Sequence, residues 1–267
     1  MARAKRHYIP GHVWHITHRC HKREFLLKFA KDRQCWLKWL LKARKRYGLV
    51  ILNYIVTSNH IHLLVLDDED RDVIPRSIQL AAGRTGQEYN IRKSRKGAFW
   101  EDRYHATAIE SGEHLLRCIV YIDFNMVRAN AVNHPSEWAF SGYNEIQNPR
   151  RKCALIAYDR LQALLNFPSY DHLVVAHRQW VEECLRDRVG GRDSKWTQSI
   201  AVGGEEFTER TKHLLGIRAR GRKVLSIGDM YQLREPEAGY RADFGPRNSD
   251  IEAENEYSWN NSIEISV

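Results

Sequence analysis

The sequence predicts an α+β protein: a ferredoxin-like sandwich with a central antiparallel sheet, followed by a mostly helical C-terminal extension. Strand-like apolar runs alternate with longer stretches of helical periodicity, in the order β-α-β-β-α-β-α. The 267 residues suffice for one moderate domain plus a substantial appendage. A polar, basic linker-like stretch near 145–155 marks the boundary, so we expect domains at 1–148 and 149–267.

The first predicted strand covers 13–19, where β-rich residues alternate. A helix is expected over 28–46, with apolar residues at helical spacing, and Gly48 ends it as a C′ glycine. The apolar run 49–56 predicts a buried strand, and 60–66 predicts a second one. A Thr-Ser-Asn turn joins the two strands into a hairpin.

A second helix is expected over about 74–92, and the basic turn that begins at Arg92 ends it. Residues 99–109 predict a fourth strand. Ser111 is a plausible N-cap for a helix from about 112 to 127, whose apolar residues share one face.

The C-terminal half predicts helices at about 157–166, 170–187 and 204–215, and a loose acidic tail over 248–267. A segment beginning at Trp196 precedes the last of these helices, which allows a helix-turn-helix. The other interpretation is a helical extension that packs against the first domain or clamps DNA.

The formal charge of +9 lies in one half of the chain. Residues 1–150 hold 25 Lys and Arg against 15 Asp and Glu, whereas 151–267 hold 17 against 18. A basic half is typical of a polyanion-binding surface. Scattered cysteines exclude a disulfide framework, and the lack of a long apolar run indicates a cytoplasmic protein with no membrane partner.

The motif Asn59-His60-Ile61-His62 carries the first candidate chemistry. Side chains alternate along a strand, so His60 and His62 face the same way. Two such imidazoles can share a divalent metal ion if a third ligand comes from elsewhere. The alternative is a pair of half-exposed histidines on a sheet surface.

The second motif lies on the predicted 112–127 helix. Tyr121 and Asn125 are four residues apart, which pairs a phenol with a metal-capable amide oxygen on one helix face. Arg128 follows three residues later and could hold a phosphate. The alternative is a tyrosine packed in the core and an asparagine that ends the helix.

In their order and spacing, the basic N-terminal region, the N-H-I-H strand, the later W-E-D-R-Y segment and the Y-I-x-x-N-x-V-R-A helix resemble the single-tyrosine HUH transposases of bacterial insertion sequences. The resemblance is closest to the REP-associated tyrosine transposases and covers roughly residues 5–145. It implies a transposase that cuts and rejoins single-stranded DNA in DNA recombination, on hairpin-forming repeats.

The resemblance also assigns roles. His60, His62 and Asn125 match the metal ligands, which implies Mg²⁺ or Mn²⁺, and Tyr121 matches the nucleophile that forms a 5′-phosphotyrosine. Met126 stands where the family usually has proline, which removes no ligand but can change how the helix ends.

Basic residues predict where DNA would bind. The candidates for contacts to the DNA backbone are Arg95, Lys96, Arg103 and Arg128. Trp100, Tyr104 and Tyr89 are candidates for base stacking. For each basic cluster the alternative is a solvated helix face or loop.

Two other functions remain open. One is a domesticated, non-cutting regulator that binds hairpin DNA or RNA through the same basic surface. The other is a zinc-dependent hydrolase built on His60 and His62. The sequence is compatible with a monomer or a homodimer, and with an active site completed within one subunit or between two. A second metal site from His15, His18, Cys20 and His21 is disfavoured because alternation separates these residues across the strand.

Overall fold

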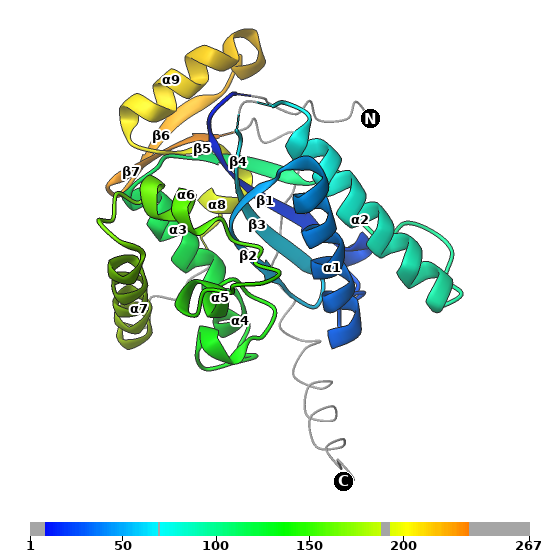
Figure 1. The fold of residues 1–267 in the computed structure, drawn as a ribbon. Coiled ribbons are helices and arrows are strands. Elements are labelled where there is room, and N and C mark those ends of the chain that lie inside the picture. The colour runs from blue at the N-terminus through cyan, green and yellow to red at the C-terminus, as the bar shows by residue number, and fades with distance from the viewer. Residues whose placement is uncertain (1–8, 69, 188–192, 235–267) are drawn as a thin grey trace. The chain divides into compact units, whose positions relative to one another are not determined.

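The computed structural model describes residues 9–68, 70–187 and 193–234, which all belong to one compact unit (Figure 1). The predicted tail at 248–267 lies outside these residues. The elements up to residue 128 are β1 (Val13–Arg19), η1 (His21–Arg23), α1 (Ala30–Tyr47), β2 (Val50–Val56), β3 (His60–Leu66), α2 (Val73–Arg92), β4 (His105–Ile109), α3 (Glu113–Asp123) and α4 (Asn125–Arg128). The later elements are η2 (Pro135–Glu137), α5 (Tyr143–Gln147), α6 (Tyr158–Leu164), α7 (Tyr170–Arg186), α8 (Lys195–Gln198), β5 (Ser199–Gly203), α9 (Glu205–Leu215), η3 (Gly216–Ala219), β6 (Lys223–Ile227) and β7 (Met230–Arg234).

The first four strands form the predicted ferredoxin-like sheet, in the order β2-β3-β1-β4 with every neighbouring pair antiparallel. Strand β1 is central and all seven of its residues are buried. The β2–β3 hairpin turns where the sequence predicts, with the Thr57 amide donating to the His60 carbonyl at 3.0 Å. This arrangement confirms the predicted fold class.

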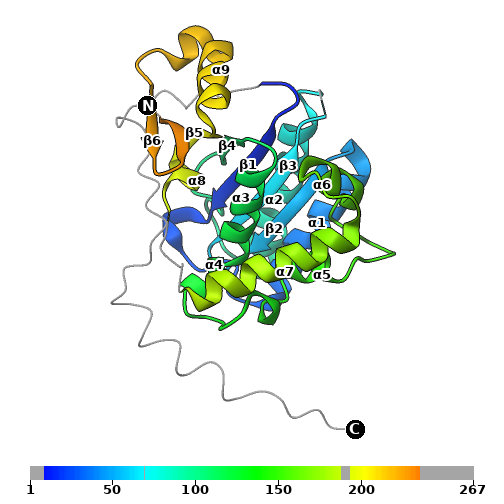
Figure 2. The same cartoon turned by 90° about the vertical axis from the view of Figure 1, so that its left-hand side faces the viewer.

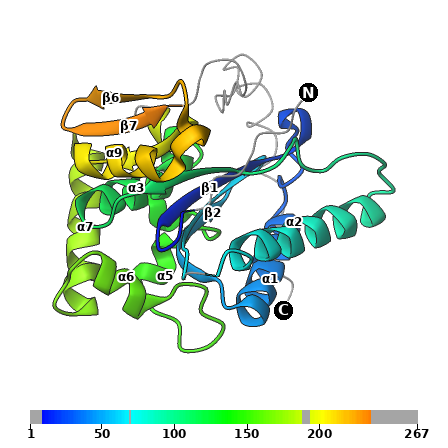
Figure 3. The ribbon, with the colours of Figure 1, turned by 90° about the horizontal axis from the view of Figure 1, so that it is seen from above.

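Helices cover both faces of this sheet (Figures 1 and 3). Helices α1 and α2 pack against each other on one face, and α3 and α6 contact β2 from the other. Gly48 takes φ 75° at the end of α1, which confirms the predicted C′ glycine. Because both faces are covered, Ile61 and His62 are both almost fully buried even though they point in opposite directions.

The C-terminal region is mostly helical where it is described, as predicted, but it also adds three strands that the sequence did not suggest. Strand β5 pairs in parallel with β4, and β7 and β6 continue the sheet in antiparallel fashion. Trp196 lies in a four-residue helix that leads directly into β5, so the helix-turn-helix interpretation is wrong. The division at residues 148 and 149 stays a prediction.

Two predicted elements of the first domain differ in extent. The strand expected over 99–109 is regular only from His105, because residues 101–103 are consecutive exposed charged side chains without alternation. The helix expected over 112–127 is interrupted at Phe124, whose φ and ψ are −76° and 0°. As a result, Tyr121 lies on α3 and Asn125 begins the short helix α4.

Candidate active site

His60 and His62 lie on the same face of β3, as the alternation predicts. Their ring centroids are 5.0 Å apart, with the rings nearly perpendicular. His60 is partly exposed at the start of the strand, whereas His62 is only 1% exposed. A surface pair of half-exposed histidines is therefore the wrong description of His62, which lies inside the protein.

The turn before β3 orients His60. Its Nδ1 is 2.6 Å from Oδ1 of Asn59 and 3.0 Å from Oγ1 of Thr57. The amide oxygen of Asn59 can only accept a hydrogen bond, so Nδ1 of a neutral His60 carries the proton. The lone pair of His60 is then on Nε2, which is the ligand atom a metal ion requires.

His15 on β1 contacts His62, a contact that the sequence did not reveal. His15 Nε2 is 2.8 Å from His62 Nδ1, and the two rings are stacked with centroids 5.0 Å apart. On its other side, His15 Nδ1 is 2.8 Å from the carbonyl oxygen of Trp196. Burial lowers the pKa of His15 to about 3, so its imidazole is neutral at physiological pH.

Tyr121 and Asn125 both reach His62. The Asn125 amide nitrogen is 2.9 Å from His62 Nε2, although the helix is interrupted between Tyr121 and Asn125. The Tyr121 ring centroid is 6.0 Å from that of His62, with the rings at 85°. One chain thus brings together His60, His62, Tyr121 and Asn125, the residues predicted for metal binding and nucleophilic attack.

Arg128 also lies at this site. Its guanidinium carbon is 4.2 Å from the centroid of the Tyr121 ring, and its NH2 donates to the Tyr121 carbonyl at 2.6 Å. The ring of Trp196, from the C-terminal region, also lies beside Tyr121, and the two ring centroids are 6.0 Å apart. The phenol is therefore flanked by a cation and an indole, and Tyr121 is 8% exposed.

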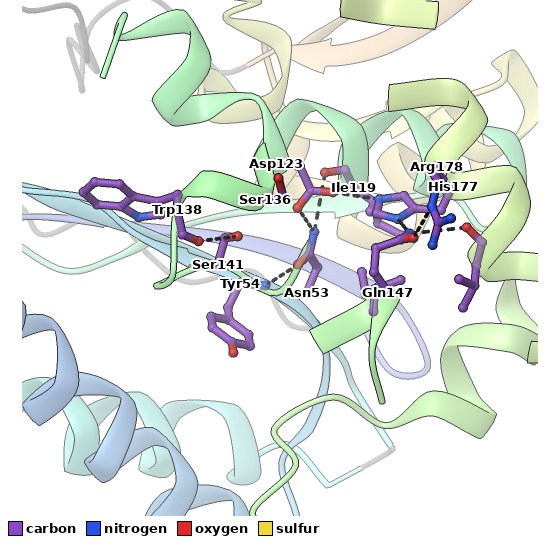
Figure 4. A network of polar contacts seen from close by, with 12 residues as sticks. Asn53, Tyr54, Ile119, Asp123, Ser136, Trp138, Ser141, Gln147, His177 and Arg178 are labelled. Carbon is purple, nitrogen blue, oxygen red and sulfur yellow. Dashed lines mark hydrogen bonds and ion pairs between the residues drawn. The ribbon is translucent and has the colours of Figure 1, made fainter. Parts of the chain in front are cut away.

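A buried polar network anchors the end of the tyrosine helix (Figure 4). Asn53 donates to Oδ1 of Asp123 at 3.0 Å, and His177 Nε2 is 2.8 Å from Oδ2 of the same carboxylate. Gln147 Nε2 is 2.9 Å from His177 Nδ1. Gly142 packs so closely here that a Cβ would overlap Oδ1 of Asn53. The network ties β2 and α7 to α3, and α7 lies beside α3 (Figure 2).

The other predicted DNA-contact residues lie elsewhere. Arg95 follows α2, bonds to the Ala98 carbonyl at 2.9 Å and pairs with Glu24 at 3.2 Å. Lys96 and Arg103 are exposed. Arg103 lines a cavity of about 500 Å³ between α2 and the segment before β4, together with His18, Trp100 and Tyr104.

Two of the three predicted stacking residues, Trp100 and Tyr104, line this cavity, and the His18 and Trp100 rings stack with centroids 4.2 Å apart. The third, Tyr89, packs edge-on against Phe99 with centroids 5.0 Å apart. His18 contacts the Asp102 carbonyl and the Trp100 ring, whereas His15 contacts the Trp196 carbonyl and His62, so these two histidines have separate surroundings.

The donor set at His62 fits a divalent cation. The Nδ1 atoms of His60 and His62 already have hydrogen-bond partners, and the Asn125 side chain needs only to turn its amide over to present its oxygen. Within the described ranges, no cluster of three or more His, Cys, Asp and Glu side chains is arranged to hold a metal ion, and the further polar side chain beside His62 is the amide of Asn125. Nothing in this set favours a zinc-dependent hydrolase.

Residues 9–125 match the family model described as IS200-like transposase. Among solved structures, one of a REP-associated tyrosine transposase bound to a REP hairpin is 23% identical, covers 54% of this chain and 84% of its own, and has a TM-score of 0.44. A candidate transposase from Deinococcus radiodurans R1 is 15% identical, covers 49% of this chain and 98% of its own, and has a TM-score of 0.33.

No curated protein matches the sequence. No helix among the described residues has the length and apolar character needed to cross a membrane. The family match covers β1 to β4 and extends through the tyrosine helix to Asn125. Over residues 9–125, which are less than half of its length, this chain is therefore similar to the IS200-like transposase family.

Proposed function

We propose that this transposase cuts and rejoins single-stranded DNA through a covalent bond between Tyr121 and a 5′-phosphate. The observation that carries the proposal is the assembly of Tyr121, His60, His62 and Asn125 around one point within a single chain. A phenol, two imidazoles and an amide are the groups that such a transesterification requires.

In the proposed cleavage step, the phenolic oxygen of Tyr121 attacks the scissile phosphorus. A bond forms between tyrosine and phosphate, and the bond from phosphorus to the 3′ oxygen breaks. The phenol loses its proton and the departing 3′ oxygen gains one, which leaves a 5′-phosphotyrosine and a free 3′-OH. Attack by a 3′-OH reverses the step, so rejoining needs no nucleotide cofactor.

His60, His62 and Asn125 would hold Mg²⁺ or Mn²⁺, which supplies charge stabilisation for the phosphate oxygens when it is bound. The protein's own contribution is positional. β3 fixes the two imidazoles, and α3 brings the Tyr121 ring to 6.0 Å from His62. Arg128, stacked on that ring, is placed to contact a phosphate beside the phenol.

The proposed substrate is hairpin-forming repeat DNA, as in the REP-associated transposases that the motif order resembles. Residues 1–150 carry the whole excess of positive charge, which suits an extended phosphate backbone. Arg95, Lys96, Arg103 and Arg128 are the proposed backbone contacts. The cavity lined by Trp100 and Tyr104 offers rings on which an unpaired base can stack.

Tyr121→Phe tests the proposal, because it removes one oxygen and keeps the ring. Wild-type protein incubated with hairpin-bearing single strands and Mn²⁺ should form a protein–DNA adduct on a denaturing gel, and the variant should form none while binding DNA nearly as well. Tyr47→Phe is the matched control, since Tyr47 ends α1, which covers the face of the sheet opposite α3.

Full cleavage by Tyr121→Phe would contradict the proposed mechanism. Tight DNA binding by the wild-type protein with no adduct under any divalent metal would instead identify it as a non-cutting regulator.

A further inference from the structure

We propose that His15 is a positioning residue for the metal site, and that the backbone of Trp196 sets its orientation. The inference rests on the proposed metal-binding role of His62. It assigns the C-terminal region a part in the active site, because Trp196 lies outside the residues that match the transposase family. A series of hydrogen bonds connects that backbone carbonyl to His62 through His15.

The first hydrogen bond in this series involves the carbonyl oxygen of Trp196, which can only be an acceptor. The Trp196 carbonyl oxygen can accept hydrogen bonds but cannot donate them, and His15 Nδ1 is 2.8 Å away. His15 Nδ1 therefore carries a proton. His15 is 0% exposed and has no carboxylate partner among its described hydrogen bonds, so its ring is neutral and Nε2 carries a lone pair.

The second link transfers this constraint to His62. His15 Nε2 and His62 Nδ1 are 2.8 Å apart, so one nitrogen must donate and the other must accept. Because His15 Nε2 is the acceptor, His62 Nδ1 is the donor. The lone pair of a neutral His62 is then on Nε2, and Asn125 approaches this atom to 2.9 Å. The opposite tautomer of His62 would place two lone pairs against each other in a buried site.

The two proposed histidine ligands are thus oriented from different parts of the chain. His60 takes its orientation from Asn59, its neighbour in the sequence. His62 takes it from His15 on the adjacent strand and, through His15, from α8. The position of that carbonyl is itself constrained, because α8 leads directly into β5, and Oγ1 of Thr107 on β4 lies 2.7 Å from the Ser199 carbonyl oxygen and 3.3 Å from that of Trp196.

Substitutions at His15 separate positioning from packing. His15→Leu keeps an apolar side chain in the space but removes the acceptor for His62 Nδ1. His15→Gln retains an amide oxygen that can accept at about the place of the imidazole Nε2. His15→Leu should weaken Mn²⁺ binding by about 10- to 100-fold, the usual cost of losing an outer-shell partner, and His15→Gln should recover most of the loss.

The first measurement is the affinity of the full chain for Mn²⁺ without DNA. The free ion is detected by electron paramagnetic resonance. His18→Gln is the matched control, because His18 is on the same strand but bonds to the Asp102 carbonyl on the opposite face. It should leave the Mn²⁺ affinity unchanged. Melting temperatures identify any variant that fails to fold.

The second measurement is the ¹⁵N nuclear magnetic resonance spectrum of wild-type protein with ¹⁵N-labelled histidine, recorded without metal. The signals of His62 are assigned as those that disappear in His62→Gln. His62 should carry its proton on Nδ1 in the wild type and should become a mixture of tautomers in His15→Leu. A wild-type His62 protonated on Nε2, or unchanged Mn²⁺ affinity in a folded His15→Leu, would overturn the inference. Neither readout requires DNA cleavage, so failure of the proposed transposase chemistry would be seen separately in the adduct assay.

Discussion

His177 on α7 donates a hydrogen bond to Asp123 at the end of α3, across 2.8 Å between Nε2 and Oδ2. The two side chains are 2% and 0% exposed. Asp123 is two residues beyond Tyr121, so this contact couples the C-terminal region to the helix that carries the proposed nucleophile. Without His177, the buried carboxylate would retain Asn53 as its hydrogen-bond donor.

We expect His177→Leu to lower the free energy of unfolding by about 1 to 3 kcal/mol, because it removes one of the two side-chain hydrogen bonds to a buried carboxyl group. Urea denaturation followed by circular dichroism measures this change. Gln179→Leu is the control on the same helix, since Gln179 is exposed, and its effect should be within about 0.5 kcal/mol. Equal stability of the two variants would show that the contact with Asp123 is dispensable.

The buried His15 predicts how stability depends on pH. Its pKa falls from 6.5 to about 3 on folding because of burial, and the neighbouring His105 lowers it further. As the pH drops below 6.5, the unfolded chain takes up a proton that the folded protein does not. This single group therefore costs about 1.4 kcal/mol of stability per pH unit until pH 3 is approached.

Denaturation of the wild type and of His15→Gln at pH 7.5, 6 and 5 isolates this contribution. The variant should lose less stability on acidification than the wild type does. Parallel pH profiles for the two proteins would contradict the assigned burial of a neutral imidazole.

The contacts of Tyr121 with His62 predict an active site completed within one chain. A mixture of Tyr121→Phe and His62→Ala should therefore form no covalent adduct with DNA, because neither chain holds both groups. As a control, each variant is mixed with wild-type protein, which shows whether the variant inhibits adduct formation by the wild type. Adduct formation in the mixture of variants would show that the tyrosine helix serves a partner subunit.

Arg103 and Lys96 test the proposed DNA-binding surface. Each side chain is exposed, and neutralising one that contacts a phosphate should reduce the slope of log affinity against log salt by about 0.7 to 0.9. Fluorescence anisotropy with a hairpin oligonucleotide at several salt concentrations measures the slope. Lys212→Gln on α9, whose amine pairs with Glu209, should not change it. An unchanged slope in Arg103→Gln would remove Arg103 from the binding surface.

The elements up to residue 128 were largely predictable because their strands and helices have clear periodicity. The H-x-H strand needed only the alternation of β3 to place His60 and His62 together. The interruption at Phe124 was not visible in the apolar periodicity, and neither were the contacts of the preceding residue, Asp123, with Asn53 from β2 and His177 from α7. The predicted spacing from Tyr121 to Asn125 nevertheless brought both residues to the same site.

The contact between His15 and His62 was missed because it depends on strand register. His15 is directly opposite Leu64 in the β1–β3 pair, and its contact with His62 is diagonal. Strands β5 to β7 were missed for a related reason. They are short, and β5 is stabilised by pairing with β4, more than 90 residues earlier in the chain. Local sequence carries little information about either pairing.

Identifying the residue that becomes covalently attached to DNA tests the proposed role of Tyr121. Wild-type protein is incubated with a hairpin-bearing single strand and Mn²⁺, digested with protease and nuclease, and analysed by tandem mass spectrometry. We predict a nucleotide linked by its 5′-phosphate to the phenolic oxygen of Tyr121. A nucleotide on any other residue, or strand cleavage with no nucleotide-bearing peptide, would exclude Tyr121 as the nucleophile.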